Sequence, residues 1–148
     1  MMTAEAGNPS QHPGISLQDR GNDLPVLHEL CHALTALHLE GTETVIDIKS
    51  LPFGESDEHR LGKALGTGEV EAVLHALGES RITETAFPGI WWIEHRNEQG
   101  EVIAKSIEVT RIPGILKSQQ ADIAAARRRL ESLVQLTDQV DESTPIDN

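Results

Sequence analysis

The chain has 148 residues, of which 24 are acidic and 12 are basic, so its formal net charge is -12. This length suits one domain with a single core. The charge does not favour a nucleic-acid partner, because binding phosphate requires clustered Lys and Arg. Cys31 is the only cysteine, which excludes an intrachain disulfide and a four-cysteine zinc or iron–sulfur site.

The sequence contains neither a candidate membrane span nor a candidate secretory signal. No run approaches the roughly 18 uninterrupted apolar residues that cross a bilayer. Residues 1–20 have neither a basic start nor an apolar middle. We therefore expect a cytoplasmic protein.

Residues 1–22 are rich in Gly, Pro, Ser, Gln and Asn and contain few large apolar side chains. Such a segment buries too little apolar surface to offset the entropy lost when it becomes ordered. We expect a disordered N-terminal arm over residues 1–22, a single domain over residues 23–137 and a loose acidic tail over residues 138–148.

An amphipathic helix is predicted between Asp23, which can cap its start, and Gly41, a residue type that commonly ends helices. Large apolar residues recur there at spacings of three and four, which predicts one buried stripe. The stripe consists of Leu24, Leu27, Cys31, Leu34 and Leu37. A short strand over residues 44–48 follows, where β-branched residues recur.

A second, shorter helix is predicted from Ser56, which can cap it, to Leu65, and Gly66 ends it. Residues 69–110 then change to a period of two, typical of strands with one buried face. We predict four strands there, over residues 69–76, 81–86, 90–95 and 101–110. Pro88-Gly89 interrupts the pattern as a break or bulge, and residues 97–100 have the composition of a hairpin turn.

A last helix is predicted to begin at Ser118. Its inner stripe consists of Ile123, Ala126, Leu130, Leu133 and Val134. The elements together predict an α+β fold, with a four- to five-stranded, largely antiparallel sheet. The two longer helices should cover one face and the short helix should lie at an edge. The uncovered face is where we expect a partner protein or a homodimer contact.

His28-Glu29-Leu30-Cys31-His32 matches the H-E-x-x-H signature of zinc proteases, and His38 follows at the spacing of the three-histidine form. Two histidines four apart on a helix face the same way and can hold Zn²⁺, while the glutamate acts on a bound water. A zinc-dependent hydrolase using His28 and His32 is therefore one alternative function.

The longer motif requires a glycine at the position of Thr35, so that the third ligand can swing back. In an unbroken helix, His38 lies roughly 9 Å along the axis from His32 and about 120° around it, whereas zinc–nitrogen bonds are about 2.1 Å long. Glu55 or Glu58 on the next predicted helix stays a possible third zinc ligand beside His28 and His32.

The methionine turn of the longer form is also missing, because the only methionines are Met1 and Met2. Cys31 lies inside the apolar stripe, where a cysteine usually behaves as a small hydrophobe. We therefore interpret the first helix as scaffold and expect no catalytic residue, no resident metal and no cofactor.

Trp91 and Trp92 are adjacent on a predicted strand, so their side chains must point to opposite faces of the sheet. One of them can serve the core. The other can pack under a loop, or it can be exposed as a binding anchor beside Phe87, Pro88 and Gly89. These five residues are the predicted partner-binding site.

The run from Thr85 to Trp92, followed by His95-Arg96-Asn97 and residues 107–116, resembles the hydrogenase expression/formation proteins HupH and HyaF. Shorter matching segments support the resemblance, which covers about Leu24 to Leu116. These segments are Val45-Ile46-Asp47, Leu51-Pro52, Leu65-Gly66, Gly68-Glu69-Val70, Ile112-Pro113 and Ile115-Leu116.

The resemblance implies accessory work in making nickel–iron hydrogenase, without catalysis by the protein itself. It implies a chaperone that binds the precursor of the small, iron–sulfur subunit, which carries a twin-arginine export signal, and that meets other maturation proteins. The family has no established catalytic residues and includes longer chains than this one. A third alternative is a small-molecule-binding α+β module with a pocket between the sheet and its helices.

Overall fold

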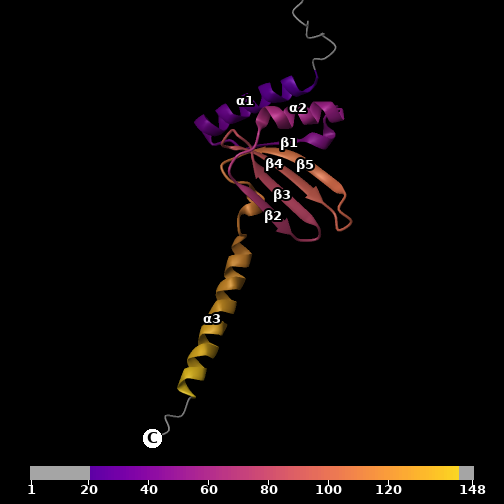
Figure 1. The fold of residues 1–148 in the computed structure, drawn as a ribbon. Coiled ribbons are helices and arrows are strands. Elements are labelled where there is room, and N and C mark those ends of the chain that lie inside the picture. The colour runs from indigo at the N-terminus through magenta and orange to yellow at the C-terminus, as the bar shows by residue number, and fades with distance from the viewer. Residues whose placement is uncertain (1–20, 144–148) are drawn as a thin grey trace, which may run out of the picture. The chain divides into compact units, whose positions relative to one another are not determined.

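The computed structural model describes residues 21–143 (Figure 1). The described residues form two units, one ending at Arg111 and one beginning at Ile112. The first unit contains one antiparallel sheet of five strands in the order β1-β5-β4-β3-β2, together with helices α1 and α2. The predicted α+β fold with a largely antiparallel sheet is confirmed. Almost all of the expected N-terminal arm lies outside the described residues.

Each predicted strand is present within a few residues of its expected position. The strands are β1 (Thr44–Asp47), β2 (Glu71–His75), β3 (Glu79–Glu84), β4 (Ile90–Arg96) and β5 (Val102–Val109). The turn at residues 97–100 joins β4 to β5, and the Asn97 side chain accepts hydrogen bonds from the amides of Gln99 and Glu101. Alternating apolar residues therefore sufficed to locate the strands.

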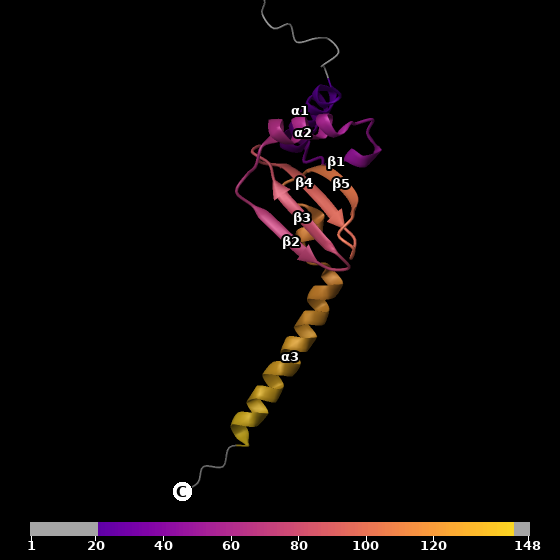
Figure 2. The ribbon, with the colours of Figure 1, turned by 45° about the vertical axis from the view of Figure 1, so that its right-hand side comes forward.

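Helices α1 (Asp23–Glu40) and α2 (Glu55–Leu65) lie together against the sheet in both views of the ribbon (Figure 2). A short 3-10 helix, η2 (Ile48–Ser50), follows β1. One cluster of buried side chains joins the two helices to β1, β4 and β5. Its members are Val26, Leu30, Ala33, Leu37, Ile46, Ile48, Leu61, Leu65, Ile90, Ile107 and Val109.

The buried face of α1 differs from the predicted stripe. Val26, Leu30 and Ala33 are buried, whereas Leu24 and Cys31 are exposed. Leucines occur on more than one side of this helix, so spacing alone permits more than one stripe. The expectation that Cys31 is a core residue is wrong.

The predicted caps at the starts of both helices are also wrong. Asn22 precedes α1, and Gly54 precedes α2. The Asp57 carboxylate accepts a hydrogen bond from the Gly54 amide at 3.0 Å and one from the Asn22 amide at 3.1 Å. The hydrogen bond from Gly54, assisted by that from Asn22 and by the Arg60 guanidinium, holds the pKa of Asp57 below its ordinary value. Asp57 therefore ties the start of α2 to the residue before α1.

The predicted helix ends are confirmed. Gly41 follows α1 in the left-handed conformation and donates its amide to the carbonyl of Leu37. Gly66 follows α2 with a positive φ and donates to the carbonyl of Gly62. Glycine adopts such backbone angles without the steric cost that a Cβ adds.

The second unit contains a 3-10 turn, η3 (Gly114–Leu116), and helix α3 (Gln120–Glu142). The helix begins at Gln120, two positions after the predicted Ser118, and it continues through the first part of the expected loose tail. No residue of α3 is buried. That this helix covers the sheet stays a prediction. Within residues 21–143, no helix is both long and apolar enough to span a membrane.

Candidate functional site

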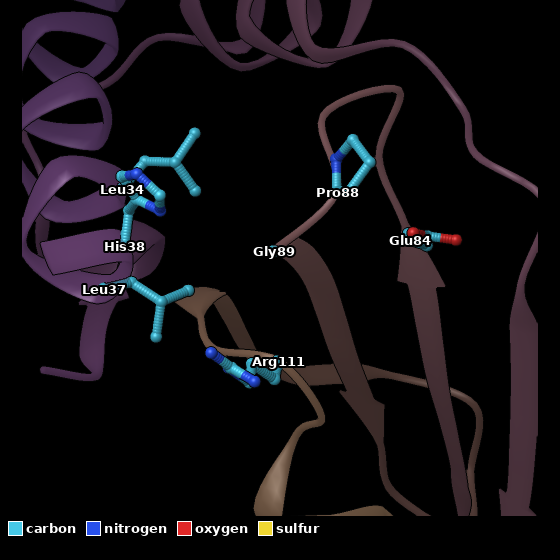
Figure 3. A pocket seen from close by; sticks show the side chains of 7 residues that line it. All are labelled: Leu34, Leu37, His38, Glu84, Pro88, Gly89 and Arg111. Atoms are coloured by element: carbon cyan, nitrogen blue, oxygen red, sulfur yellow. The ribbon is translucent and has the colours of Figure 1, made fainter. Parts of the chain in front are cut away.

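The loop between β3 and β4, residues 85–89, faces α1 across an open cavity. Figure 3 shows Leu34, Leu37 and His38 on α1 opposite the part of the loop that carries Pro88 and Gly89. The cavity has a volume of about 550 Å³, and Glu84 and Arg111 complete its lining. Two of the five predicted partner-binding residues, Pro88 and Gly89, therefore line this cavity.

Local hydrogen bonds give this loop a defined conformation. The Thr85 hydroxyl accepts from the Phe87 amide at 3.2 Å. The Thr85 amide donates to the carbonyl of Ile90 at 3.0 Å, and the Ile90 amide donates to the carbonyl of Phe87 at 3.0 Å. The Ala86 amide reaches the carbonyl of Leu65 at the end of α2, at 2.9 Å. The loop is thus fastened to both β4 and α2.

A second hollow, of about 170 Å³, adjoins the first and shares Leu34 with it. Apolar side chains and Cys31 line it: Leu27, Leu30, Cys31, Leu34, Leu65, Phe87 and Ile90. The Phe87 residue is 48% exposed beside this hollow. We call the two hollows together the helix–loop groove. Its walls are α1 and residues 87–89.

The polar groups of the helix–loop groove lie around the larger hollow. They are the imidazole of His38, the carboxylate of Glu84 and the guanidinium of Arg111. A leucine-lined surface with a few charged groups at its margin is the usual composition of a site that accepts an apolar segment of another molecule.

The two tryptophans point to opposite faces, as predicted. Trp91 is only 6% exposed, and its indole nitrogen donates to the carbonyl of Thr110 at 3.1 Å. Trp92 is half-buried against the helices. Its side chain lines a separate hollow of about 390 Å³, together with Glu58 and Lys105, which lie 2.5 Å apart as an ion pair. Neither ring lies in the helix–loop groove, so as partner contacts they stay predictions.

The histidines of the H-E-x-x-H motif lie on the exposed side of α1. In residues 21–143, no three His, Cys, Asp or Glu side chains are placed where they could hold a metal ion. The structure does not bring Glu55 or Glu58 into a ligand set with His28 and His32. The zinc interpretation therefore has no third protein ligand within the described chain.

Sequence reasoning found the loop side of the groove and missed its helix side. The sequence pattern places Leu34 in the predicted core stripe and His38 at the spacing of a third zinc ligand, and it gives Arg111 no role. No local signal marks these three residues. They become neighbours of Gly89 only through the packing of α1 beside the loop.

These features define a small α+β module with an open, largely apolar groove. Residues 21–137 match the family described as HupH hydrogenase expression protein, C-terminal conserved region. The chain belongs to this family. The resemblance inferred from the sequence is confirmed, and the match extends beyond Leu116 into α3.

Proteins similar to this chain share hydrogenase-related names. Hydrogenase expression/formation protein HupQ of Azotobacter chroococcum is 37% identical over 111 residues, which is 74% of this chain and 39% of that protein. Hydrogenase-1 operon protein HyaF of Escherichia coli is 25% identical, over 77% of this chain and 39% of that protein. The chain thus spans about two-fifths of the length of these relatives.

The solved structure of hydrogenase expression protein HupH from Thiobacillus denitrificans has the same fold. The TM-score is 0.75 and the sequence identity is 44%, and the match covers 80% of this chain and 98% of that one. The relatives together support a role in hydrogenase maturation.

Proposed function

We propose that this chain is an accessory protein of nickel–iron hydrogenase maturation that binds the precursor of the small, iron–sulfur subunit in the cytoplasm, before export. The names of its relatives support the hydrogenase connection. The helix–loop groove supports binding of another polypeptide, and it is the observation that carries the proposal.

The groove suits an extended or helical apolar segment of the partner. Leucine side chains of α1 form one wall, and the half-exposed ring of Phe87 stands at the opposite wall. An aromatic side chain beside an apolar hollow is a typical anchor in protein interfaces. Export signals carry an apolar stretch of about 7–15 residues behind a basic start. The leader of the precursor therefore offers the segment that the groove accepts.

Charge supports the same assignment. The chain carries a net charge of -12, and complementary charge raises the rate at which two proteins meet. In this proposal, the basic start of the leader is attracted to the acidic chain at long range, and the apolar stretch of the leader binds in the helix–loop groove. In this scheme the chain holds the precursor and performs no chemistry on it.

The deciding experiment is a titration of the purified full chain with the small-subunit precursor. We expect Phe87→Ala to weaken binding about tenfold or more, because anchor residues of this kind contribute more than about 1.4 kcal/mol. Leu39→Ala is the matched control, since Leu39 lies on α1, is 72% exposed and does not line the groove. Equal affinity of Phe87→Ala and the wild type would remove the groove from the proposal.

The function itself is tested by affinity capture from cells that are producing hydrogenase. We expect the small-subunit precursor and other maturation proteins among the captured partners. Recovery of no hydrogenase subunit under these conditions would count against the maturation role, whatever the state of the groove.

A further inference from the structure

Helix α3 carries a regular series of exposed residues, all apolar except Thr137. Positions along one side repeat at alternating intervals of three and four. They are Ile123, Ala126, Leu130, Leu133, Thr137 and Val140. Ile123, Leu130 and Leu133 are 50%, 61% and 59% exposed. Alternating intervals of three and four are typical of helices that pair side by side. We call this series the α3 seam.

The length and the exposure of α3 leave a large apolar surface uncovered. At 1.5 Å per residue, the 23 residues of α3 span about 35 Å. In proteins, packing of an apolar face supplies most of the stability of a helix, more than the helix propensity of its residues does. The flanking Val134 and Leu136 are also more than half exposed, at 52% and 61%, and they widen the apolar surface beyond the seam.

The α3 seam is complementary to itself when reversed. Its midpoint lies between Leu130 and Leu133, and the same intervals follow in both directions. Two antiparallel copies centred there place equivalent layers opposite each other. The layers pair Leu130 with Leu133, Ala126 with Thr137, and Ile123 with Val140. A two-fold axis through the midpoint then produces one closed, symmetric interface.

Charge favours the antiparallel arrangement over the parallel one. The first half of α3 contains Arg127, Arg128 and Arg129 together with Asp122 and Glu131, and the second half has no basic residue and carries Asp138, Asp141 and Glu142. Parallel pairing would place the arginines of both copies at the same level. Antiparallel pairing places them level with residues 134–136 of the partner, within about one helical turn of its Asp138, and leaves Asp122 level with Asp141. It also opposes the two helix dipoles, and arginine stems can cover neighbouring apolar side chains.

We propose that the chain forms a symmetric dimer in which α3 packs antiparallel against α3 of a second copy along the α3 seam. This interface uses none of the helix–loop groove.

Sedimentation velocity of the full chain tests the dimer. We expect wild-type protein to sediment as a dimer at about 10–100 μM, a range in which micromolar dissociation constants are resolved. Leu130→Glu combined with Leu133→Glu should sediment as a monomer. The control, Ser132→Glu combined with Gln135→Glu, adds the same charge on the opposite side of α3 and should stay dimeric.

Tryptophan emission checks folding in the same samples. Trp91 and Trp92 both lie in the sheet unit, so an unchanged emission maximum shows that the unit is intact in the monomeric variant. A wild-type protein that is monomeric throughout this range would overturn the proposal. A dimer that survives the double seam substitution would overturn it as well.

Cysteine cross-linking tests the antiparallel orientation without adding charge. In a Cys31→Ser background, chains with A126C and chains with T137C should form a mixed disulfide, because these positions face each other across the axis. Neither chain should cross-link efficiently by itself. Efficient self-linking of A126C alone would indicate parallel pairing and overturn the proposed geometry.

Discussion

Gly89 determines how closely the β3–β4 loop approaches α1. Its φ is +96°, and a Cβ at this position would lie 3.1 Å from Leu34 Cδ1 and 3.4 Å from Leu37 Cδ2. Any other residue would strain the backbone and push against the helix wall. The width of the helix–loop groove therefore depends on the absence of one side chain.

We expect Gly89→Ala to lower the free energy of unfolding by about 1–3 kcal/mol, measured by urea denaturation. Gly100→Ala is the matched control, because Gly100 also has a positive φ, +81°, but an added Cβ there meets nothing within 4 Å. The excess loss in Gly89→Ala reports the contact with α1. Equal losses in the two variants would show that this contact has no energetic weight.

Glu108 is a second residue whose surroundings set its behaviour. It lies on β5 opposite Trp91 on one side and Val45 on the other. Burial raises the pKa of Glu108 above its ordinary value of 4.5, the charge of Glu43 raises it further, and His95 opposes the shift. The folded protein therefore binds this proton more tightly than the unfolded chain does.

Because the pKa of Glu108 is higher in the folded protein, ionisation of this carboxyl lowers the free energy of unfolding. The loss is absent below pH 4.5, where the carboxyl is protonated in both states, and it grows as pH rises through the folded pKa. We expect Glu108→Gln to have a higher Tm than the wild type at pH 7, with the difference shrinking as pH falls to 4. Thermal unfolding at several pH values measures it. A difference that grows toward low pH would contradict the assignment.

At the scale of elements, α1 has an inner side and an outer side with different roles. Val26, Leu30 and Leu37 belong to the core, while His28 and His32 face outward. The inner side fixes α1 in place, and Leu34 beside it forms part of the groove wall. The histidines match a zinc-protease motif in sequence, but within residues 21–143 no third side chain is placed to complete a metal site with them.

We expect His28→Ala combined with His32→Ala to change the free energy of unfolding by less than about 0.5 kcal/mol, as exposed substitutions usually do. Leu30 lies between the two histidines in the sequence but is buried. Leu30→Ala should therefore lower the free energy of unfolding by about 2–5 kcal/mol, because it opens a cavity in the core. Metal analysis of protein purified without added zinc completes the test. Stoichiometric zinc that disappears in the histidine variant would revive the hydrolase alternative.

At the scale of the whole molecule, the net charge of -12 predicts that recognition of a basic leader depends on salt. Raising NaCl from about 0.1 M to about 1 M shortens the Debye length from about 10 Å to about 3 Å. We expect this change to weaken binding of the leader-bearing precursor, measured by fluorescence anisotropy. Precursor without its leader should bind weakly at both concentrations. Salt-independent binding, or equal binding without the leader, would remove the leader from the proposal.

Local patterns in the sequence were sufficient to predict the strands, the hairpin turn and the glycine-terminated helix ends. Alternation between apolar and polar residues follows directly from strand geometry, and positive φ at Gly41 and Gly66 follows from the absence of a Cβ. The family was also evident from the run around Trp91 and Trp92, because contiguous residues carry it. Each of these features depends on residues that are neighbours in the chain.

Tertiary structure decided three further features. These are the side of α1 that is buried, the face of the sheet on which each tryptophan lies, and the groove between Leu34 and Gly89. Leucines on several sides of α1 permit more than one stripe, and only the surface of the sheet selects among them. The sequence predicts Ser56 as the cap of α2, whereas in the structure the carboxylate of Asp57 accepts hydrogen bonds from the amide of Gly54 and from that of Asn22, 35 residues away in the chain. These outcomes depend on contacts between residues far apart in sequence, which no local period encodes.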